Sequence, residues 1–510
     1  MTTLSKALQR HARRRSSRTA LVSKAGHRSY AELDARVNQT ANALMAAGLG
    51  KSDRLALMSP NTENFVFTYY AAMRLGLVFV PVNPRMAAPE VQYLLEDSGA
   101  RAFIFDSSLA AVALAGCAKA APGPELVLAA DATDAHDSLA IRANAAPTTA
   151  PQVEVSASDD AEILYTSGTT GKPKGVLLDQ HRVTWVAVNM CTGVGMRDGE
   201  SMLHVAPLYH SAELNLFLNG GLLIGARHVL LESFEPGEVL ATMERERTSA
   251  FFGVPTMYQF MLRHPDFAKR DLSAWRIGMF GAAPMPPATI DALAKAVPDV
   301  VLYNLCGPSE AGPGGIVLGG EDLARYPGAN GWAFLNTEVR VVDDADHDVK
   351  AGETGEILLR GETIMKGYWN KPEATAKALR NGWLHTGDVG RIDVDGCITL
   401  VDRKKDMIIT GGMNVYSVEV ENALASHPDI LDCAVVGLPH PDYGESIVAV
   451  VTPREGAKLT LAGVRKHAMQ FIADYKAPQR LVMGEVPRNP SGKIIKHQLR
   501  KALKNNSASN

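Results

Sequence analysis

Helical and strand-like patterns alternate along the first hundred residues, and this alternation restricts the chain to a small group of folds. Residues 29–48 repeat apolar side chains at helical spacing, with a serine to cap the start and a glycine near the end. Short apolar runs at residues 54–59, 77–82 and 101–106 indicate buried strands, and a second helical pattern occupies residues 63–76. Strands that alternate with helices predict an α/β fold with doubly wound, parallel sheets.

Beyond the first hundred residues the sequence pattern changes. The whole chain of 510 residues is too long for one hydrophobic core. Residues 107–158 are rich in Ala, Pro, Asp and Thr and only weakly patterned, so we expect them to pack at the surface. From about residue 337, short strands with turn signals predict a small β-rich subdomain. Beyond Asp402, helical patterns flank two strand patterns and predict a compact α+β domain.

The charge balance and the cysteine pattern argue against several classes of protein. With 52 basic and 55 acidic residues the net charge is −3, so no nucleic-acid partner is expected. The five cysteines are scattered and form no CxxC pair, which argues against a disulfide framework or a zinc site. We expect a cytoplasmic protein, since a reducing cytosol fits and neither a signal peptide nor a bilayer-spanning run is evident.

The N-terminal segment from Arg10 to Arg18 is strongly basic and allows two interpretations. Its arginines could contact anionic lipid and give a weak membrane-surface contact. They could instead form the solvated face of a first helix that buries Leu4 and Leu8, which is the interpretation that we favour.

The segment "ILYTSGTTGKPKGVLL", residues 163–178, has the composition of a phosphate-binding loop. Its glycines let backbone N–H groups approach an anion, while its hydroxyls and lysines add donors and positive charge. It is not the P-loop of nucleotide triphosphatases, because that motif reads GxxxxGK[ST] and here Pro173 follows Lys172. The candidate phosphate ligands are Thr166, Ser167, Gly168, Thr169, Thr170 and Lys174.

This loop resembles, almost letter for letter, the "YTSGTTGxPKG" signature of the adenylate-forming superfamily. That superfamily includes acyl-CoA synthetases, firefly luciferase and peptide-synthetase adenylation domains. Further similar segments follow in the family's order, so that the resemblance covers about residues 5–500, and its nearest match is to bacterial fatty-acyl and aryl-CoA synthetases. These segments are "APLYHSAEL" (206–214), "GVPTMY" (253–258), "GAAPMP" (281–286), "NLCGPSE" (304–310), "KGYWNKPEAT" (366–375), "GWLHTGD" (382–388), "DRKKDMIITGGMNVYSVEVE" (402–421) and "PRNPSGKI" (487–494).

The resemblance implies a ligase reaction in two steps that uses ATP, Mg²⁺ and coenzyme A. A carboxylic acid would first displace pyrophosphate from ATP to give acyl-AMP, and the thiol of CoA would then displace AMP. The resemblance also implies a large N-terminal adenylation domain, residues 1–401, and a small mobile C-terminal domain, residues 402–510, with Asp402 at the hinge. Homodimers are common in this family.

The resemblance also assigns roles to individual residues, and the chemistry of each suits its role. Glu310 would hold Mg²⁺, a hard cation that prefers oxygen ligands, and Asp388 would bind the ribose hydroxyls. Lys493 would act as a mobile point charge on the reacting oxygens, and His210 would lie near the acyl carboxylate or the thiol. The implied catalytic residues are therefore Lys493, Glu310 and His210. The implied ATP and AMP ligands are the six loop residues above with Gly281, Ala282, Ala283, Asn304, Leu305, Cys306, Gly307, Ser309, Asp388 and Arg403, while Gly411 and Gly412 would line the CoA path.

Three positions depart from the family pattern. Cys306 stands where the family usually has an aromatic ring stacked on adenine, and a thiol offers far less stacking area. Ser309 replaces the usual threonine and keeps its hydroxyl, and Ser417 replaces a common proline.

The segments expected to line the acyl site indicate the class of acid. Residues 209–221 lack the aspartate with which amino-acid-activating relatives pair the substrate amine, so an amino acid is not expected. The lining segments are apolar, and Gly312, Gly314 and Gly315 would leave room beside Glu310. We expect a monocarboxylic acid with a large hydrophobic body: a medium- or long-chain fatty acid, an aryl acid or a bulky polycyclic acid.

Two other functions stay open. Acyl-AMP ligases that load carrier proteins are similar, but they usually carry an insertion in the N-terminal domain that is not evident here, so CoA is favoured as the acceptor. A non-catalytic regulator that binds ATP or acyl-AMP would be expected to have lost Lys493 or Glu310, and both are present.

Overall fold

The computed structural model describes residues 3–166, 172–488 and 494–507, and the chain divides into two compact units. Unit 1 comprises Met1–Glu338 and Leu359–Leu384, and unit 2 comprises Val339–Leu358 and His385–Asn510. The chain passes from one unit to the other within three strands, which are β16 (Thr337–Val342), β17 (Thr354–Gly361) and β20 (Trp383–Ile392). The domain boundary predicted between residues 401 and 402 is a different kind of division and stays a prediction.

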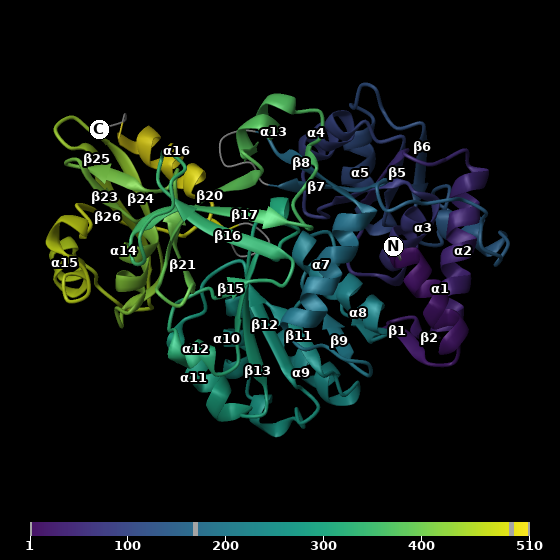
Figure 1. Cartoon of the computed structure of the whole chain (residues 1–510), viewed down its shortest axis with the longest axis horizontal. Helices are drawn as coiled ribbons and strands as arrows, with labels where there is room; N and C mark the ends of the chain where they lie inside the picture. Colours follow the sequence, from purple (N-terminus) through teal and green to yellow (C-terminus); the bar gives the residue numbers. More distant parts are fainter. Residues whose placement is uncertain (1–2, 167–171, 489–493, 508–510) are drawn as a thin grey trace. The chain divides into compact units, whose positions relative to one another are not determined.

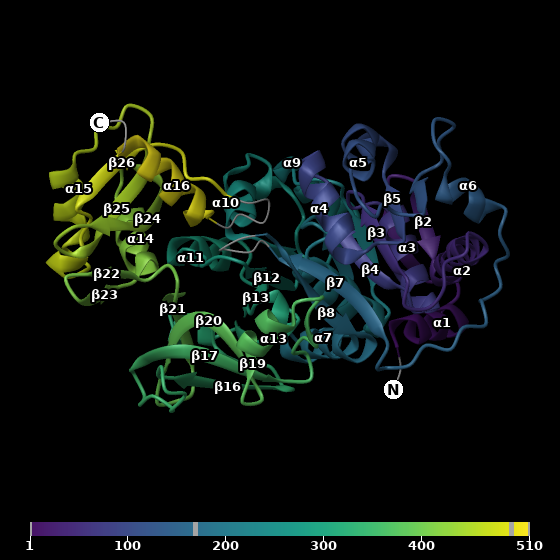
Figure 2. The same ribbon diagram turned by 90° about the horizontal axis from the view of Figure 1, so that it is seen from above.

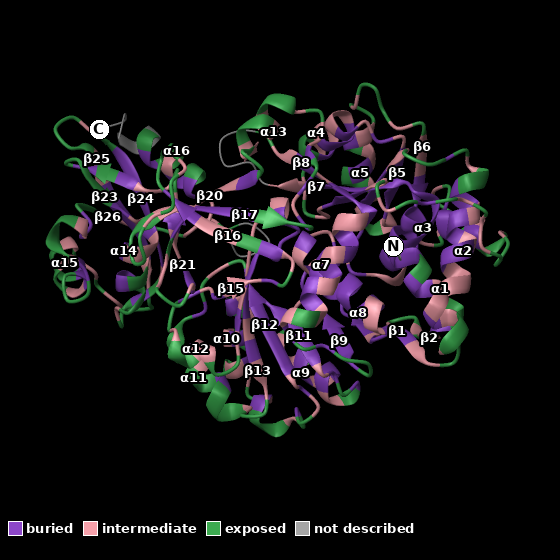
Figure 3. Cartoon of the chain, in the orientation of Figure 1, coloured by how far each residue is buried: buried purple, intermediate pink, exposed green. Residues whose placement is uncertain are grey.

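Unit 1 contains a nine-stranded sheet in the order β15-β14-β13-β12-β11-β9-β10-β1-β2, whose strands from β13 to β1 are parallel (Figure 1). The strands are β1 (Thr19–Ser23), β2 (Gly26–Ser29), β9 (Ser201–His204), β10 (Arg227–Leu230), β11 (Ala250–Gly253), β12 (Ile277–Gly281), β13 (Val301–Cys306), β14 (Ile316–Gly319) and β15 (Trp332–Ala333). The helices of this part are α7 (Gln180–Gly193), α8 (Asn219–Ile224), α9 (Pro236–Arg245), α10 (Pro255–Arg263), α11 (Pro287–Ala296) and α12 (Asp322–Arg325). Strands β9, β11 and β12 are fully buried, whereas α11 exposes most of its residues (Figure 3).

Unit 1 also contains a seven-stranded sheet in the order β18-β8-β7-β4-β3-β5-β6, which is parallel from β7 to β6. The strands are β3 (Arg54–Met58), β4 (Val78–Val82), β5 (Ala102–Phe105), β6 (Leu126–Ala129), β7 (Asp160–Thr166), β8 (Lys174–Asp179) and β18 (Gly367–Tyr368). The accompanying helices are α1 (Leu4–Arg14), α2 (Tyr30–Ala46), α3 (Glu63–Leu75), α4 (Ala88–Ser98), α5 (Ala110–Cys117), α6 (Leu139–Asn144) and α13 (Pro372–Ala378). Parallel strands joined by helices confirm the predicted doubly wound α/β class.

Strand β4 shows why the central strands are continuous apolar runs. Successive side chains of a strand point to opposite faces of its sheet. On one face Val80 belongs to the same buried cluster as Leu94 of α4, and on the other the rings of Phe79 and Tyr69 of α3 lie 5.1 Å apart. Helices α3 and α4 therefore cover opposite faces of β4, whose five residues are all buried (Figure 2).

Residues 107–158 are more ordered than the sequence predicted. They contain α5, β6 and α6, and β6 pairs in parallel with β5 as the edge strand of the seven-stranded sheet. Leu128 and Ala129 of β6 are buried. The prediction of a surface segment was wrong for β6, because a four-residue strand that buries half of its side chains leaves little periodic signal.

The basic N-terminal segment forms helix α1 and the turn after it. Leu4 and Leu8 are fully buried, as predicted for the core-facing side of this helix. Arg15 and Arg18 each approach the carboxylate of Asp198 at 2.5 Å. The lipid contact stays a prediction.

The strands and helices of unit 2 beyond β16, β17 and β20 build a second, smaller core. The strands are β21 (Ile398–Arg403), β22 (Ile408–Thr410), β23 (Met413–Val415), β24 (Ile430–His440), β25 (Gly444–Pro453) and β26 (Arg480–Met483), and the helices are α14 (Ser417–Ala425), α15 (Leu461–Ala468) and α16 (Lys496–Ser507). Strand β21 pairs with β20, while the other five form a sheet in the order β23-β22-β25-β24 with β26 beside β25. Strand β19 (Leu379–Arg380) of unit 1 also pairs with β20.

The two faces of strand β24 are covered by different helices of unit 2. Val435 belongs to a buried cluster with Leu424 of α14, and Val436 belongs to a second cluster with Leu499 of α16. The sequence analysis did not single out helix α16. No helix in the described ranges is long and apolar enough to cross a membrane.

A buried polar network joins strand β7 to the segment after His210. Glu162 of β7 is fully buried, and its carboxylate accepts hydrogen bonds from the Tyr69 hydroxyl at 2.6 Å and from the Asn215 amide at 2.8 Å. The Asn219 amide in turn donates to the Tyr69 hydroxyl at 2.7 Å. Burial raises the pKa of Glu162 to about 7, against the opposing effect of these hydrogen bonds.

This network predicts a specific dependence of stability on pH. The pKa of Glu162 is raised from 4.5 to about 7 on folding, so its contribution is fully present below pH 4.5 and is lost as the pH rises through 7. As the pH rises from below 4.5 to above 7, the free energy of unfolding of the wild type should fall by about 3 kcal/mol more than that of Glu162→Gln. This difference does not depend on how the substitution changes stability at any one pH. Denaturant unfolding of the wild type and the variant across this range measures the difference. The exposed Glu154→Gln is the control, and an unchanged slope in Glu162→Gln would contradict the raised pKa.

Candidate active site

The candidate phosphate loop connects two paired strands of unit 1. Strands β7 and β8 are antiparallel, and Thr166 at the end of β7 pairs with Lys174 at the start of β8. The ammonium nitrogen of Lys174 lies 4.8 Å from the centre of the Tyr368 ring, a cation–π contact. Four candidate ligands lie outside the described residues, namely Ser167, Gly168, Thr169 and Thr170.

Tyr368 connects this loop to the proposed metal ligand. Strand β18 pairs with β8, which places Tyr368 opposite Val176. The Tyr368 hydroxyl donates a hydrogen bond to Oε1 of Glu310 at 2.8 Å. Glu310 lies in a short 3-10 helix, η4 (Ser309–Ala311), which begins three residues after the end of β13. One tyrosine therefore contacts a cation with its ring and a carboxylate with its hydroxyl, and it holds Lys174 and Glu310 in one cluster.

The sequence analysis did not single out Tyr368, although its segment "KGYWNKPEAT" was identified. The signal in the sequence was its position within a family motif, together with a ring and a hydroxyl that can each contact a charged group. Its role depends on Glu310, which is 58 residues away in the chain.

The segment that carries His210 meets the Glu310 motif through two serines. The hydroxyl oxygens of Ser211 and Ser309 lie 2.9 Å apart. His210 is half-buried, and its Nδ1 accepts a hydrogen bond from the Ala212 amide at 3.3 Å. The π-helix η2 (Ala212–Leu218) begins two residues after His210, and this form of helix is frequent at functional sites. The structure thus brings the segments that carry His210 and Ser309 next to each other.

The candidate adenine segments end at one edge of the nine-stranded sheet. Gly281 of β12 pairs with Leu305 of β13, and the two strands are parallel, so their carboxyl ends lie together. A Cβ atom on Gly281 would come within 2.6 Å of the Leu305 carbonyl oxygen, and one on Gly307 within 2.6 Å of the Gly315 nitrogen. Ala282 has a φ of 66°, a left-handed conformation that costs a non-glycine residue on the order of 1 kcal/mol.

The side chains of the 304–306 segment face different surroundings. The Asn304 amide donates to the Ala329 carbonyl at 3.3 Å, and Leu305 packs in a buried apolar cluster. Leu305 therefore presents only its backbone to a ligand. Cys306 is half-buried at the end of β13, and its carbonyl accepts a hydrogen bond from Gly315 at 3.2 Å.

The glycines after Glu310 do not leave room for substrate, and this prediction was wrong. A Cβ atom on Gly312 would come within 2.2 Å of Val186, one on Gly314 within 2.9 Å of Leu216, and one on Gly315 within 2.7 Å of Leu359. The space is filled by side chains from other elements of unit 1. These positions are glycine because the backbone packs closely there.

Unit 2 contains the other predicted nucleotide ligands. Asp388 of β20 and Arg403 of β21 are directly opposite in the paired strands, and Arg403 Nε lies 2.9 Å from Asp388 Oδ1. Both side chains are partly exposed. An arginine and a carboxylate in this arrangement offer a ligand both a positive charge and an acceptor for hydrogen bonds from hydroxyl groups.

The predicted CoA-path glycines form a tight turn. Gly411 and Gly412 connect β22 to β23 and have φ angles of 57° and 77°. Two successive residues with positive φ are the requirement of a type I′ hairpin turn, which gives these glycines a structural reason of their own. Their role in the CoA path stays a prediction.

The predicted catalytic lysine, Lys493, lies outside the described residues. Residues on either side of its segment are paired, since Arg488 and Ile494 form an antiparallel bridge and the Ile495 amide donates to the Pro487 carbonyl at 2.8 Å. The base of the segment is therefore closed.

Glu310 is the candidate magnesium ligand of unit 1. No group of three or more metal-ligating side chains occurs among the described residues. Mg²⁺ is commonly held by one or two carboxylates together with substrate phosphates and water, and Glu310, oriented by Tyr368, suits that mode of binding.

Two known family models match most of the chain. Residues 8–369 match the AMP-binding enzyme family, and residues 419–493 match the C-terminal domain of AMP-binding enzymes. The chain belongs to the AMP-binding enzyme family.

Several known proteins are similar over nearly their whole length. A feruloyl-CoA synthase of Amycolatopsis sp is 39% identical over 479 residues, with 93% of each chain covered. The long-chain-fatty-acid–CoA ligase FadD13 of Mycobacterium tuberculosis is 37% identical over 479 residues, with 92% of each covered. The 7a-methyl-1,5-dioxo-octahydro-1H-inden-4-yl propanoyl:CoA ligase of that species is 34% identical over 508 residues, with 98% of each covered.

Among solved structures, ATP-bound MatB from Rhodopseudomonas palustris matches with a TM-score of 0.89 and 30% identity, over 98% of this chain and 99% of that chain. The predicted adenylate-forming fold and the predicted class of AMP-forming acyl-CoA ligase are confirmed. Such enzymes use ATP, Mg²⁺ and CoA with a small-molecule acid.

Tyr368→Phe tests the cluster around Glu310. The variant keeps the ring beside Lys174 but removes the hydrogen bond that orients the Glu310 carboxylate. Loss of such an orienting partner typically weakens metal binding 10- to 100-fold, so half-maximal pyrophosphate release should need roughly tenfold more Mg²⁺. The exposed Tyr475→Phe serves as the control. An unchanged Mg²⁺ requirement would restrict Tyr368 to a packing role.

Proposed function

We propose that this protein activates a hydrophobic monocarboxylic acid with ATP to acyl-AMP and then transfers the acyl group to CoA, releasing AMP and pyrophosphate. The observation that carries this proposal is the Lys174–Tyr368–Glu310 cluster of unit 1. It places a cation of the loop motif and a carboxylate suited to a metal on opposite sides of one tyrosine. The contact between Ser211 and Ser309 adds the segment of His210 to the same region.

The proposed class of acid rests on residues 209–221, which offer no carboxylate to pair with the amine of an amino-acid substrate. Within 209–221 the one acidic residue is Glu213, which is fully buried and shares a 2.6 Å contact with Nδ1 of His204. Burial raises the pKa of Glu213 well above its ordinary value, so it does not offer a carboxylate to a substrate amine. The named substrates of the relatives are feruloyl, long-chain fatty and polycyclic acids, which supports a fatty, aryl or polycyclic acid here.

The chemistry requires compensation of charge more than proton transfer, because the attacking carboxylate and the triphosphate are both anions. We assign Glu310 to Mg²⁺ and Lys174 with Thr166 and the other loop residues to the phosphates. Gly281–Ala283 and Asn304–Ser309 would border the nucleotide base. In unit 2, Asp388 would accept hydrogen bonds from the ribose hydroxyls, and Arg403 would add positive charge beside them.

The second step and the setting of the enzyme complete the proposal. We propose CoA rather than a carrier protein as the acceptor, with Gly411 and Gly412 along its path, Lys493 acting in the first step, and Asp402 as the hinge between the two arrangements of the C-terminal domain. We place the protein in the cytoplasm, on the scattered and odd number of cysteines. A homodimer and a weak contact of the Arg10–Arg18 segment with membrane surfaces are further proposals.

A panel of acids tests this function directly. The purified chain is given ATP and Mg²⁺ with fatty, aryl, polycyclic, dicarboxylic and amino acids, with and without CoA, and AMP and pyrophosphate are measured. We expect continuous AMP release only with CoA and a hydrophobic monocarboxylic acid. Turnover of amino acids would contradict the substrate class, and ATP binding without turnover of any acid would identify a regulator.

Lys493→Ala should separate the two steps. Loss of one preorganised charge partner typically lowers a rate by about 10²–10³, so adenylation should fall by that factor. Conversion of supplied acyl-AMP and CoA to thioester should stay near the wild-type rate, because that step does not involve the triphosphate. Lys501→Ala, an exposed lysine of α16, is the matched control. Equal slowing of both steps would show that Lys493 does not act in adenylation alone.

A further inference from the structure

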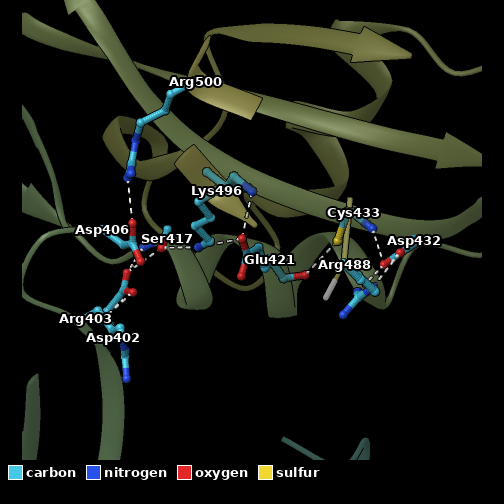
Figure 4. Close-up of polar contacts among 11 residues, drawn as sticks. Asp402, Arg403, Asp406, Ser417, Glu421, Asp432, Cys433, Arg488, Lys496 and Arg500 are labelled. Carbon is cyan, nitrogen blue, oxygen red and sulfur yellow. Dashed lines mark hydrogen bonds and ion pairs between the residues drawn. The ribbon is translucent and has the colours of Figure 1, made fainter. Parts of the chain in front are cut away.

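The carboxylate of Asp402, the proposed hinge residue, is buried and bound on both oxygens (Figure 4). Its Oδ1 accepts a hydrogen bond from the Arg403 backbone amide at 2.7 Å. Its Oδ2 accepts from the backbone amide of Ser417 and, at 2.6 Å, from the Ser417 hydroxyl. Ser417 is the first residue of α14, so the beginning of this helix holds the hinge carboxylate.

A buried lysine continues this contact to helix α16. The ammonium of Lys496, the first residue of α16, donates to the Ser417 hydroxyl at 2.5 Å and lies 2.7 Å from Oε1 of Glu421. The Ser417 hydroxyl therefore accepts from Lys496 while it donates to Asp402, and a relay of this kind strengthens each bond. Burial raises the pKa of Glu421, while Lys496 lowers it. Buried charges of this kind are stable only while their partners stay in place.

A second contact joins the same two segments. Arg500 lies four residues after Lys496, so both side chains emerge from one face of α16. The guanidinium of Arg500 lies 2.9 Å from Oδ1 of Asp406. Helix α16 therefore binds the chain just after the hinge at two points, through Ser417 to Asp402 and directly to Asp406 (Figure 4).

The helix begins three residues after Lys493. The bridge between Arg488 and Ile494 closes the base of the Lys493 segment, and α16 starts two residues beyond Ile494. A continuous set of contacts in unit 2 thus connects Asp402 to the base of that segment.

We propose that Ser417 and Lys496 form a polar latch that couples the hinge carboxylate to the helix following Lys493, and that both act as positioning residues for adenylation. The proposal rests on the proposed function, in which Asp402 is the hinge and Lys493 acts in the first step. The serine is specific to this role, because the proline that is common at this position in the family has no N–H to donate. In this chain Ser417 supplies two donors to one carboxylate oxygen.

Substitution of Asp402 itself would not distinguish the loss of a hinge function from a loss of folding, because its carboxylate is buried and both of its oxygens accept hydrogen bonds. Ser417→Pro is a sharper variant, since proline is well tolerated at the first position of a helix but removes both donors. Ser417→Ala keeps the N–H and removes only the relay to Lys496. Lys496→Met removes the ammonium, and the exposed Lys501→Met on the same helix is its matched control.

Both half-reactions are measured for each variant, by pyrophosphate release and by thioester formation from supplied acyl-AMP. Ser417→Pro and Lys496→Met should slow pyrophosphate release roughly 10- to 100-fold, the typical effect of losing an orienting partner, and leave thioester formation near the wild-type rate. The double variant Ser417→Ala with Lys496→Met should be no slower than the slower single variant, because both remove one relay. Equal loss in both half-reactions would indicate a purely structural role and would overturn the latch.

Lys493→Ala and hydrogen exchange distinguish failure of the latch from failure of the proposed function. If Lys493→Ala loses adenylation while Ser417→Pro and Lys496→Met do not, the latch is overturned and the proposed function stands. If Lys493→Ala keeps adenylation, the proposed function fails and the latch is judged by backbone exchange alone. Lys496→Met should then speed amide exchange at residues 402–406, and exchange equal to that of Lys501→Met would overturn the latch.

Discussion

A carboxylate and a triphosphate repel each other, and a protein that joins them must hold opposite charges close together without letting those charges neutralise one another. In two places the structure has a neutral side chain between a cation and a carboxylate. In unit 1, Lys174 contacts the ring of Tyr368, and the hydroxyl of the same residue binds Glu310. Because the tyrosine stands between them, the lysine and the carboxylate each keep capacity for a ligand. In unit 2 the Ser417 hydroxyl lies between Lys496 and Asp402, and Lys496 also pairs with Glu421.

The fold supplies the positions of these groups through close backbone approach. The β7–β8 hairpin and β18 place Lys174 next to Tyr368, and the parallel ends of β12 and β13 bring two candidate nucleotide segments to one edge. Gly281 and Gly307 allow contacts that a Cβ atom would block. The glycines after Glu310 follow the same rule, so they are packing positions.

The sequence predicted best what depends on neighbouring residues. Helix α2 begins where the serine cap at residue 29 predicted, and that serine and Glu32 form a reciprocal pair of hydrogen bonds. Contacts between distant residues could not be predicted in this way. In the sequence Ser417 only replaces a common proline, and its contacts are made with Asp402, 15 residues before it, and Lys496, 79 residues after it. The same holds for Tyr368 and Glu310, whose motifs were identified separately, and for β6, which is defined by its pairing with β5.

The central claim, that the acid attacks the α-phosphorus of ATP to give an acyl-adenylate, can be tested by the fate of one oxygen atom. The accepted acid is supplied with both carboxylate oxygens labelled with ¹⁸O, together with unlabelled ATP, Mg²⁺ and CoA, and the released nucleotide and pyrophosphate are analysed by mass spectrometry. Attack at the α-phosphorus leaves one carboxylate oxygen on that phosphorus when CoA takes the acyl group. The account therefore predicts AMP that carries a single ¹⁸O and pyrophosphate that carries none. Label in pyrophosphate or phosphate, with unlabelled nucleotide, would show activation at another phosphorus and would contradict the assignment of this chain's residues to an adenylate-forming site.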